Sequence, residues 1–337
     1  MSMKALVLHG KDGDYRYESE WKKPERPEKW LLIKVKYSGI CGSDIPRLAQ
    51  NGSYYHPIIL GHEFSGIVAE ADPDSVYHEN DPVAVLPIMP CEVCENCMAR
   101  GPFHCKSYQF IGSRNDGGFA EYCAVPEKNV LKLTSKDILK AGAFLEPMAV
   151  GLHTVRRSGF LPGKTAVVFG SGPIGLMIGL WLREFGGQRI IMADLREMNL
   201  RIAKDAGFEI ADLSNKSISN LSGIDYAFEA AGSAKALIDA VDALNGLGTL
   251  AVVGRDVKDT IIPVDIFEKL MRKEVQMIGC WGYDMRGEHS FMARVLEKNA
   301  DILERLITHE VEIENAVVLI GAMCEKKLEY CKVMIKF

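Results

Sequence analysis

The chain has 337 residues, of which 47% are hydrophobic and 25% charged, with a formal net charge of -5 and a pI near 6.0. This is the composition of an ordinary globular protein, and the length predicts about two domains. The acidic balance argues against nucleic-acid binding, which needs a basic surface. We also expect no membrane span, because no apolar stretch reaches the required ~18 residues, and no secretory signal.

The first part of the chain, to about residue 150, is rich in short strand patterns. Residues 30–37 (WLLIKVKY) alternate between apolar and polar side chains, and residues 67–69 and 83–86 are similarly apolar. Frequent Gly and Pro separate these runs. The pattern predicts an antiparallel, barrel-like β domain, which the segment from about 285 to 337 completes.

Three short segments of this part carry metal-ligand chemistry. Cys41 lies in SGICGSD, His62 and Glu63 in GHEFSG, and Glu146 in EPMAV. Each residue alone would more often be structural. Together, a thiol, an imidazole and a carboxylate can hold Zn2+ and leave one coordination position open.

Four further cysteines form a C-x2-C-x2-C-x7-C motif in a segment rich in loop residues: Cys91, Cys94, Cys97 and Cys105. Four thiolates so close together suit a closed tetrahedral zinc site, which stabilises a loop and performs no chemistry. The alternative is two disulfides. Nine cysteines, an odd number, in a chain without a secretory signal instead predict reduced thiols and a cytoplasmic location.

Residues 151–284 alternate between strand and helix patterns. Apolar strand-like runs recur at 165–170, 189–194, 225–230, 249–254 and 274–279, and helical patterns follow the first two of them. This alternation predicts a doubly wound parallel sheet, the Rossmann arrangement.

A glycine motif follows the first of these strands. Gly170, Gly172 and Gly175 form G-x-G-x-x-G, with Pro173 and Ile174 between the last two. In this position the glycines permit a tight turn, close approach to a pyrophosphate and close packing of helix on strand. Asp194, at the end of the second strand, would accept hydrogen bonds from a ribose and favour NAD, whereas the nearby Arg196 keeps NADP as an alternative.

The four-cysteine lobe, GHEFSG and GSGPIG stand in the order and spacing of the zinc-dependent medium-chain dehydrogenases/reductases, and the chain resembles that family over essentially its full length. The resemblance implies a GroES-like β domain, a Rossmann domain, two zinc ions per chain and a homodimer or homotetramer. It also implies that Cys41, His62, Glu63 and Glu146 supply the catalytic zinc sphere, with the two carboxylates not necessarily bound at once. Glu-Pro at 146 is typical of the polyol and threonine dehydrogenase branch.

The resemblance gives Ser43 the role of relaying the proton of the alcohol. The family's usual next relay member is a histidine, where this chain has Pro46. The relay beyond Ser43 is therefore left to water or to the cofactor ribose.

Two arginines bear on the substrate. Arg47 and Arg114 lie in the segments CGSDIPRL and FIGSRNDGGFAEY, which are similar to those of polyol-phosphate dehydrogenases. Guanidinium groups suit phosphate, so we expect oxidation of a polyol phosphate such as galactitol 1-phosphate. If these arginines only pin loops, a sorbitol-type enzyme for unphosphorylated polyols remains. Threonine or another secondary alcohol, and an inactive binding protein, are further alternatives.

Overall fold

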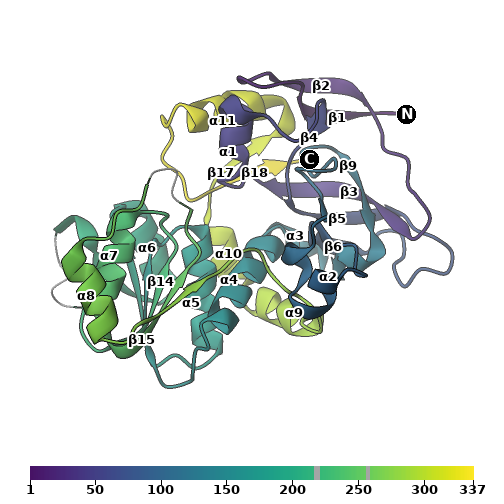
Figure 1. Cartoon of the computed structure of the whole chain (residues 1–337). Helices are drawn as coiled ribbons and strands as arrows, with labels where there is room; N and C mark the ends of the chain where they lie inside the picture. Colours follow the sequence, from purple (N-terminus) through teal and green to yellow (C-terminus); the bar gives the residue numbers. More distant parts are fainter. Residues whose placement is uncertain (216–220, 256–258) are drawn as a thin grey trace. The chain divides into compact units, whose positions relative to one another are not determined.

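The computed structural model describes residues 1–215, 221–255 and 259–337 (Figure 1). The chain divides into two compact units, the first formed by Met1–Glu146 with Met285–Phe337 and the second by Pro147–Asp284. The boundary expected near residue 150 falls inside helix α4 (Leu145–Arg157), because the chain passes from the first unit to the second within a continuous helix. None of the helices described is long and apolar enough to cross a membrane.

Unit 1 is mainly β structure. Its strands are β1 (Ser2–Leu8), β2 (Tyr15–Lys22), β3 (Trp30–Gly39), β4 (Ile58–Ile59), β5 (Glu63–Glu70), β6 (Pro82–Val85), β7 (Ile88–Met89), β8 (Gln109–Phe110), β9 (Tyr122–Pro126), β10 (Val130–Lys132), β17 (Ile307–Glu312) and β18 (Lys332–Lys336). Its shorter helical segments are α1 (Asp44–Pro46), α2 (Glu95–Ala99), α3 (Leu139–Gly142), α9 (His289–Lys298), α10 (Ala300–Arg305) and α11 (Ala316–Cys324).

The strands of unit 1 form a seven-stranded sheet in the order β10-β6-β5-β3-β18-β17, with β9 also paired to β3. A three-stranded sheet (β2-β1-β4) and a two-stranded one (β7-β8) accompany it. All pairs are antiparallel except β17 with β18. The alternation expected for residues 30–37 is present only over residues 33–36 of β3, because Leu31, Leu32 and Ile33 are all buried.

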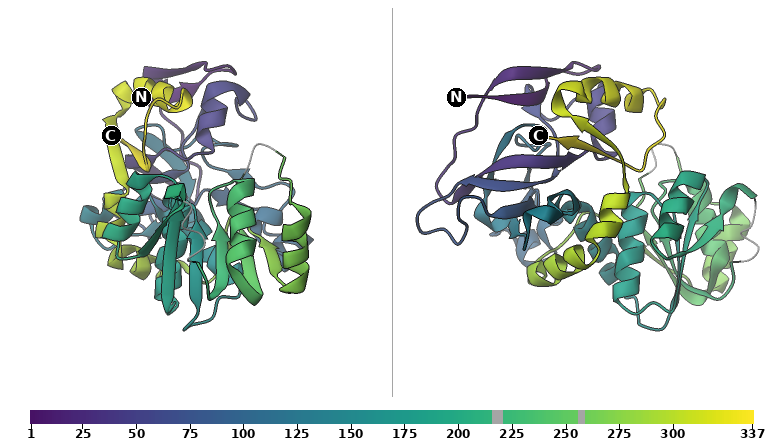
Figure 2. Two further views of the ribbon diagram at one scale, coloured as in Figure 1. Left: turned by 90° about the vertical axis from the view of Figure 1, so that its left-hand side faces the viewer. Right: turned by 180° about the vertical axis from the view of Figure 1, so that it is seen from behind.

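The C-terminal segment completes unit 1. Strand β18 pairs with β3, and helix α11 packs with β1 and β4 in a common apolar core that includes Val7, Ile59, Ile320 and Val333. In both views of Figure 2 this yellow segment lies beside the purple N-terminal strands. The last residues of the chain therefore reach the strand that leads to the metal ligands.

Unit 2 alternates between strands and helices. In chain order these are β11 (Thr165–Phe169), α5 (Pro173–Glu184), β12 (Arg189–Asp194), α6 (Glu197–Asp205), β13 (Glu209–Asp212), β14 (Ile224–Glu229), α7 (Ala234–Ala243), β15 (Leu244–Val252), α8 (Val264–Arg272) and β16 (Gln276–Gly279). The five strand-like runs of the sequence fall on β11, β12, β14, β15 and β16.

The six strands of unit 2 form a parallel sheet in the order β13-β12-β11-β14-β15-β16. This is the Rossmann order, in which the direction of winding reverses between β11 and β14. Val167 and Phe169 of β11 pack with α7 and α8, whereas Val168 faces the start of α5. The sheet is thus covered on both faces, which explains why its strands are almost continuously apolar.

Candidate active site and metal centres

The four cysteines of the C-x2-C-x2-C-x7-C motif come together around helix α2. The Sγ atom of Cys97 lies 3.8 Å from that of Cys91 and 3.4 Å from that of Cys94. Thiolates bound at ~2.3 Å to one tetrahedral zinc would lie about 3.8 Å from each other. The spacing therefore fits a closed zinc centre, whereas the sulfur atoms of a disulfide are only about 2.05 Å apart.

Backbone N–H groups favour thiolates at two positions of this lobe, whereas burial raises the pKa of the Cys97 thiol. The N–H groups of Val93 and Cys94 lower the pKa of the Cys91 thiol, and the N–H of Cys91 donates to the Sγ atom of Cys105 at 3.5 Å. The guanidinium of Arg286 donates to the carbonyl of Cys97 at 3.1 Å. The lobe is thereby attached to the returning C-terminal segment of unit 1.

A second cluster forms where strands β3 and β5 meet. Gly39 of β3 pairs with Glu63 of β5 in the antiparallel register, so Cys41 and His62 emerge side by side. The ligand atoms of Cys41, His62 and Glu63 all lie within 4.8 Å of one another. A Cβ atom at position 39 would approach the Glu63 carboxylate to 2.5 Å, so a larger residue there would displace this carboxylate.

A buried carboxylate that the sequence analysis missed orients this cluster. Asp44 is fully buried, accepts the N–H of Cys41 at 3.1 Å and lies 3.4 Å from the Nδ1 atom of His62. A carboxylate beside one imidazole nitrogen fixes the ring and leaves the other nitrogen for a metal. Burial opposes a charged imidazole, yet the charges of Asp44 and Cys41 outweigh it and raise the pKa of His62. The cluster thus favours a cation, as a zinc site requires.

A buried ion pair holds the third residue of the cluster. The ammonium of Lys332, on β18, lies 2.5 Å from the Glu63 carboxylate and also donates to the carbonyl of Ile40 at 3.3 Å. Both charged side chains are 96% or more buried, at 4% and 3% exposed. Because Lys332 is 269 residues from Glu63, no local pattern in the sequence could have identified it.

Glu146 lies beside the cluster, at the start of α4. It is buried, and burial raises its pKa to about 7, partly offset by the charge of His62. Its carboxylate is not one of the three ligand groups within 4.8 Å of each other. The Ser43 hydroxyl donates to the Cys41 sulfur at 3.3 Å. Nearby Pro46 provides no side-chain donor or acceptor.

Arg47 and Arg114 meet at one aromatic ring. Their guanidinium carbons lie 5.2 Å and 4.2 Å from the centre of the Tyr54 ring. The N–H of Arg114 donates to the carbonyl of Phe110 at 2.8 Å, and the Phe110 ring packs edge-on against His62 at 5.6 Å. Only two contacts therefore separate the arginine pair from a ligand of the second cluster.

The glycine loop of unit 2 joins β11 to α5. Gly170 has a positive φ of 97°, and a Cβ atom on Gly175 would lie only 1.8 Å from the Gly170 carbonyl, so both positions require glycine. Nothing lies within 4 Å of the Cβ position of Gly172, which leaves room for a phosphate group. Pro173 and Ile174 begin α5, whose N-terminal N–H groups point toward this space.

Asp194 ends β12 beside this loop. Its carboxylate accepts the N–H of Ser171 at 2.7 Å, the N–H of Arg196 at 2.8 Å and the amide of Asn199 at 3.0 Å. The residue predicted to bind a ribose therefore also braces the glycine loop. The Ser171 contact could not be predicted, because it depends on how β12 lies next to β11.

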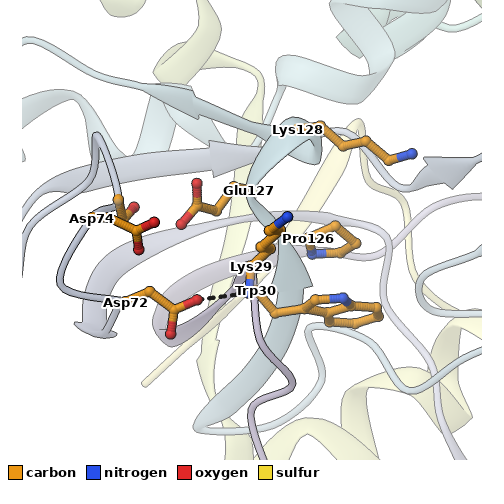
Figure 3. Close-up of a pocket in the computed structure, with 8 residues that line it drawn as sticks. Lys29, Trp30, Asp72, Asp74, Pro126, Glu127 and Lys128 are labelled. Atoms are coloured by element: carbon orange, nitrogen blue, oxygen red, sulfur yellow. Dashed lines mark hydrogen bonds between the residues drawn. The ribbon is translucent and has the colours of Figure 1, made fainter.

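A surface hollow of about 500 Å³ in unit 1 is a separate feature (Figure 3). Asp72 at its rim accepts the N–H of Lys29 at 2.7 Å and pairs with Arg26 at 2.6 Å. None of the predicted site residues lines it, and the Asp72 carboxylate is already paired with Arg26. We therefore place the candidate active site at the second cluster.

Comparisons with known proteins show the family of the chain. Residues 27–135 match the family model of the alcohol dehydrogenase GroES-like domain, and residues 173–298 match that of zinc-binding dehydrogenases. The chain is 33% identical over 322 residues to galactitol 1-phosphate 5-dehydrogenase of Escherichia coli (strain K12), covering 92% of this chain and 93% of the relative. It is 30% identical to probable D-xylulose reductase A of Aspergillus clavatus, covering 85% and 84%.

Solved structures of dehydrogenases share the fold of this chain. The crystal structure of galactitol-1-phosphate dehydrogenase from Escherichia coli superposes with a TM-score of 0.91 at 32% identity, covering 99% of this chain and 100% of that one. A chain from Sinorhizobium meliloti 1021, described as a zinc-binding dehydrogenase and bound to NADP, superposes with a TM-score of 0.89 at 27% identity over the full length of both.

The lobe generates a first prediction. Replacing Cys97 with serine removes one thiolate of the closed set, so zinc bound per chain falls by about one equivalent and the melting temperature drops. Metal analysis together with thermal unfolding measures both. Cys324→Ser, outside the lobe, is the control and keeps its zinc. Full zinc content and unchanged melting of Cys97→Ser would contradict the assignment.

The buried ion pair generates a second prediction. Lys332→Met leaves the Glu63 carboxylate buried without its cation, which lowers the free energy of unfolding by about 3–5 kcal/mol. The matched control is Lys336→Met on the same strand, whose partner Glu312 is 53% exposed, and which changes stability by less than about 1 kcal/mol. Urea unfolding of both variants measures the two free energies of unfolding. Equal losses of stability in the two variants would show that the buried Lys332 pair contributes no more than an exposed pair.

Proposed function

Because the chain belongs to the zinc-dependent medium-chain dehydrogenases/reductases, we propose that it is an NAD-dependent enzyme that oxidises a secondary alcohol of a phosphorylated polyol, such as galactitol 1-phosphate. The family makes it an oxidoreductase of the alcohol dehydrogenase type that acts on a small molecule. The observation that carries the finer proposal is the pair of arginines, Arg47 and Arg114, gathered on Tyr54 and linked to the second cluster through Phe110.

We further propose two zinc ions per chain, one in the four-cysteine lobe and one at the second cluster. Cys41, His62 and a carboxylate from Glu63 or Glu146 would hold the second ion. Zinc bound there supplies a Lewis acid and the nicotinamide accepts a hydride. The donor set, the orienting carboxylate of Asp44 and the preference of the cluster for a cation support this assignment.

Ser43 is the proposed proton carrier. Its hydroxyl is exposed and lies 3.3 Å from the Cys41 sulfur, so it stands at the edge of the ligand cluster and in contact with solvent. A hydroxyl both accepts and donates a proton in hydrogen bonds. It can therefore receive the alcohol proton on one side and pass one to water or to a ribose on the other, without the histidine that Pro46 replaces.

Phosphate recognition by the arginines is supported by their unpaired charge. Among the described residues, no carboxylate lies within ion-pair distance of either guanidinium. Two like charges close together are costly unless an anion joins them. A phosphate dianion at the far end of a polyol would provide it, through charge-assisted bonds to both groups.

The substrate proposal has a direct test. Arg47→Ala or Arg114→Ala removes one charge-assisted contact, worth roughly 1.5–3 kcal/mol or about ten- to a hundredfold in affinity, and raises KM for galactitol 1-phosphate by that factor. KM for galactitol changes far less, because galactitol has no phosphate to bind. Steady-state kinetics on both substrates, with threonine as a third, measures this. Equal losses on both polyols would leave a plain polyol dehydrogenase.

The preference for NAD rests on Asp194. Its carboxylate ends β12, where a ribose 2′-hydroxyl would donate to it and a 2′-phosphate would be repelled. Asp194→Ala should raise KM for NAD about tenfold or more and narrow the preference over NADP. Because Asp194 also braces Ser171, Asp194→Asn serves as a control that preserves the shape of the side chain. A wild-type enzyme that uses NADP more efficiently than NAD would contradict the proposal.

We also propose that the protein is a homodimer or homotetramer. In the described part of unit 2, β16 ends the parallel sheet, with only β15 beside it, and Met277 on it is 42% exposed. The neighbouring α8 exposes Phe267 (51%) and Met271 (54%). An unpaired edge next to apolar side chains favours pairing with another chain. Light scattering on the wild type and on Met277→Lys tests this: the wild type should be oligomeric and the variant a smaller species.

A further inference from the structure

Arg47 and Arg114 are held together by aromatic rings and hydroxyls. Arg114 lies over two tyrosine rings, 4.2 Å from the centre of Tyr54 and 4.4 Å from that of Tyr108. Arg47 shares the first ring, at 5.2 Å. Each ring face attracts a cation through its quadrupole. The rings therefore offset part of the repulsion that two adjacent guanidinium groups would otherwise feel.

The backbone fixes the same arrangement. Ser53 donates its hydroxyl to the carbonyl of Ser113 at 2.8 Å, which ties the two chain segments together. The same hydroxyl accepts a bond from Arg47 at 3.4 Å. Since Ser53 precedes Tyr54 and Ser113 precedes Arg114, this single link sets the distance between the ring and the guanidinium groups.

The pKa of the Tyr54 hydroxyl shows that the two guanidinium groups favour a negative charge near them. Burial raises its pKa, but a hydrogen bond from Arg47 and the charge of Arg114 outweigh burial and lower it. An oxygen at this point is thus stabilised when it carries negative charge. Because the phenol oxygen acts there as an acceptor, its own proton remains free to be donated to a further group.

We propose that Tyr54 and Tyr108 form an aromatic clamp that holds Arg47 and Arg114 as a two-guanidinium receptor for the substrate phosphate, and that Tyr54 donates a further hydrogen bond to that phosphate. Tyr54 is then a specificity-determining residue, and Tyr108 a positioning residue that acts through Arg114. The inference rests on the proposed function, because the phosphate is that of the polyol substrate.

The clamp has a second consequence. Tyrosine and arginine side chains that are already gathered lose less conformational freedom when the phosphate binds, and this preorganisation strengthens binding without a new contact. The ring of Tyr54 should therefore contribute to affinity even when its hydroxyl is removed. Comparison of a variant that keeps the ring with one that loses it separates these two contributions.

The experiment uses the zinc-loaded enzyme with NAD and three variants, Tyr54→Phe, Tyr54→Leu and Tyr108→Leu. Tyr54→Leu should raise KM for galactitol 1-phosphate about two- to thirtyfold, the range of a cation–π contact, and weaken competitive inhibition by inorganic phosphate to a similar degree. Tyr54→Phe keeps the ring and should lie between this variant and the wild type. Tyr108→Leu should also raise that KM. For all three, KM for galactitol and kcat should change by no more than about twofold.

Tyr55→Leu is the matched control, because Tyr55 is the neighbouring exposed tyrosine and its ring contacts neither arginine. Zinc content and melting temperature identify any variant that fails to fold. If the arginine variants lose galactitol 1-phosphate selectively while the tyrosine variants behave like Tyr55→Leu, the clamp is overturned and the phosphate proposal stands. If the wild type does not prefer galactitol 1-phosphate to galactitol, the proposed function itself is overturned.

Discussion

The pairing of β3 with β5 is the constraint on which the candidate site depends. The register that sets Gly39 against Glu63 brings the ends of two strands together, and both metal-ligand segments begin there. The arrangement buries a carboxylate, which costs several kcal/mol unless it is paired. Lys332 supplies the partner, and it lies on the last strand of the chain. The C-terminal segment is thus needed for the site as well as for the fold.

The same requirement for paired charge explains how the ligands are arranged. Asp44 and Glu63 are both buried, and each faces a potential cation: the imidazole of His62 for the first and the ammonium of Lys332 for the second. The backbone also fixes both pairs: Asp44 accepts the N–H of Cys41, and Lys332 donates to the carbonyl of Ile40. These polar contacts hold the side chains from several directions, which is the kind of support that positions metal ligands.

Much of this could be predicted from the sequence, because the predictive features are local. The spacing of the four cysteines, the glycine loop after an apolar strand, and the alternation of strand and helix each depend on neighbours in the chain. The parallel sheet follows from that alternation together with the handedness of the crossovers, whereas the order of its strands is known only from the structure. The family and the two-domain fold were therefore accessible, and the comparisons confirm both.

The residues that were missed act over long sequence distances. Asp44 had a weak local signal, since a carboxylate three residues after Cys41 can accept the N–H of that residue. Lys332 had none, because a lysine in a short terminal strand looks like any surface cation until β18 is seen to pair with β3. Tyr54 was missed for the same reason, because it meets Arg114 across 60 residues of chain, where Ser53 bonds to Ser113. Tyr108 is only six residues from Arg114, but nothing in the local pattern shows that its ring lies under the guanidinium.

The two charged clusters of unit 1 have opposite character and lie close together. One gathers a thiol and carboxylates around an imidazole and attracts a cation, whereas the other gathers two guanidinium groups on tyrosine rings and attracts an anion. Phe110 connects them, because its ring contacts His62 and its carbonyl binds the N–H of Arg114. A substrate that satisfies both clusters must present a hydroxyl at one point and a negative charge a short distance away. A phosphorylated polyol meets both conditions with a phosphate dianion, whereas threonine offers only a singly charged carboxylate, next to an ammonium that the arginines would repel.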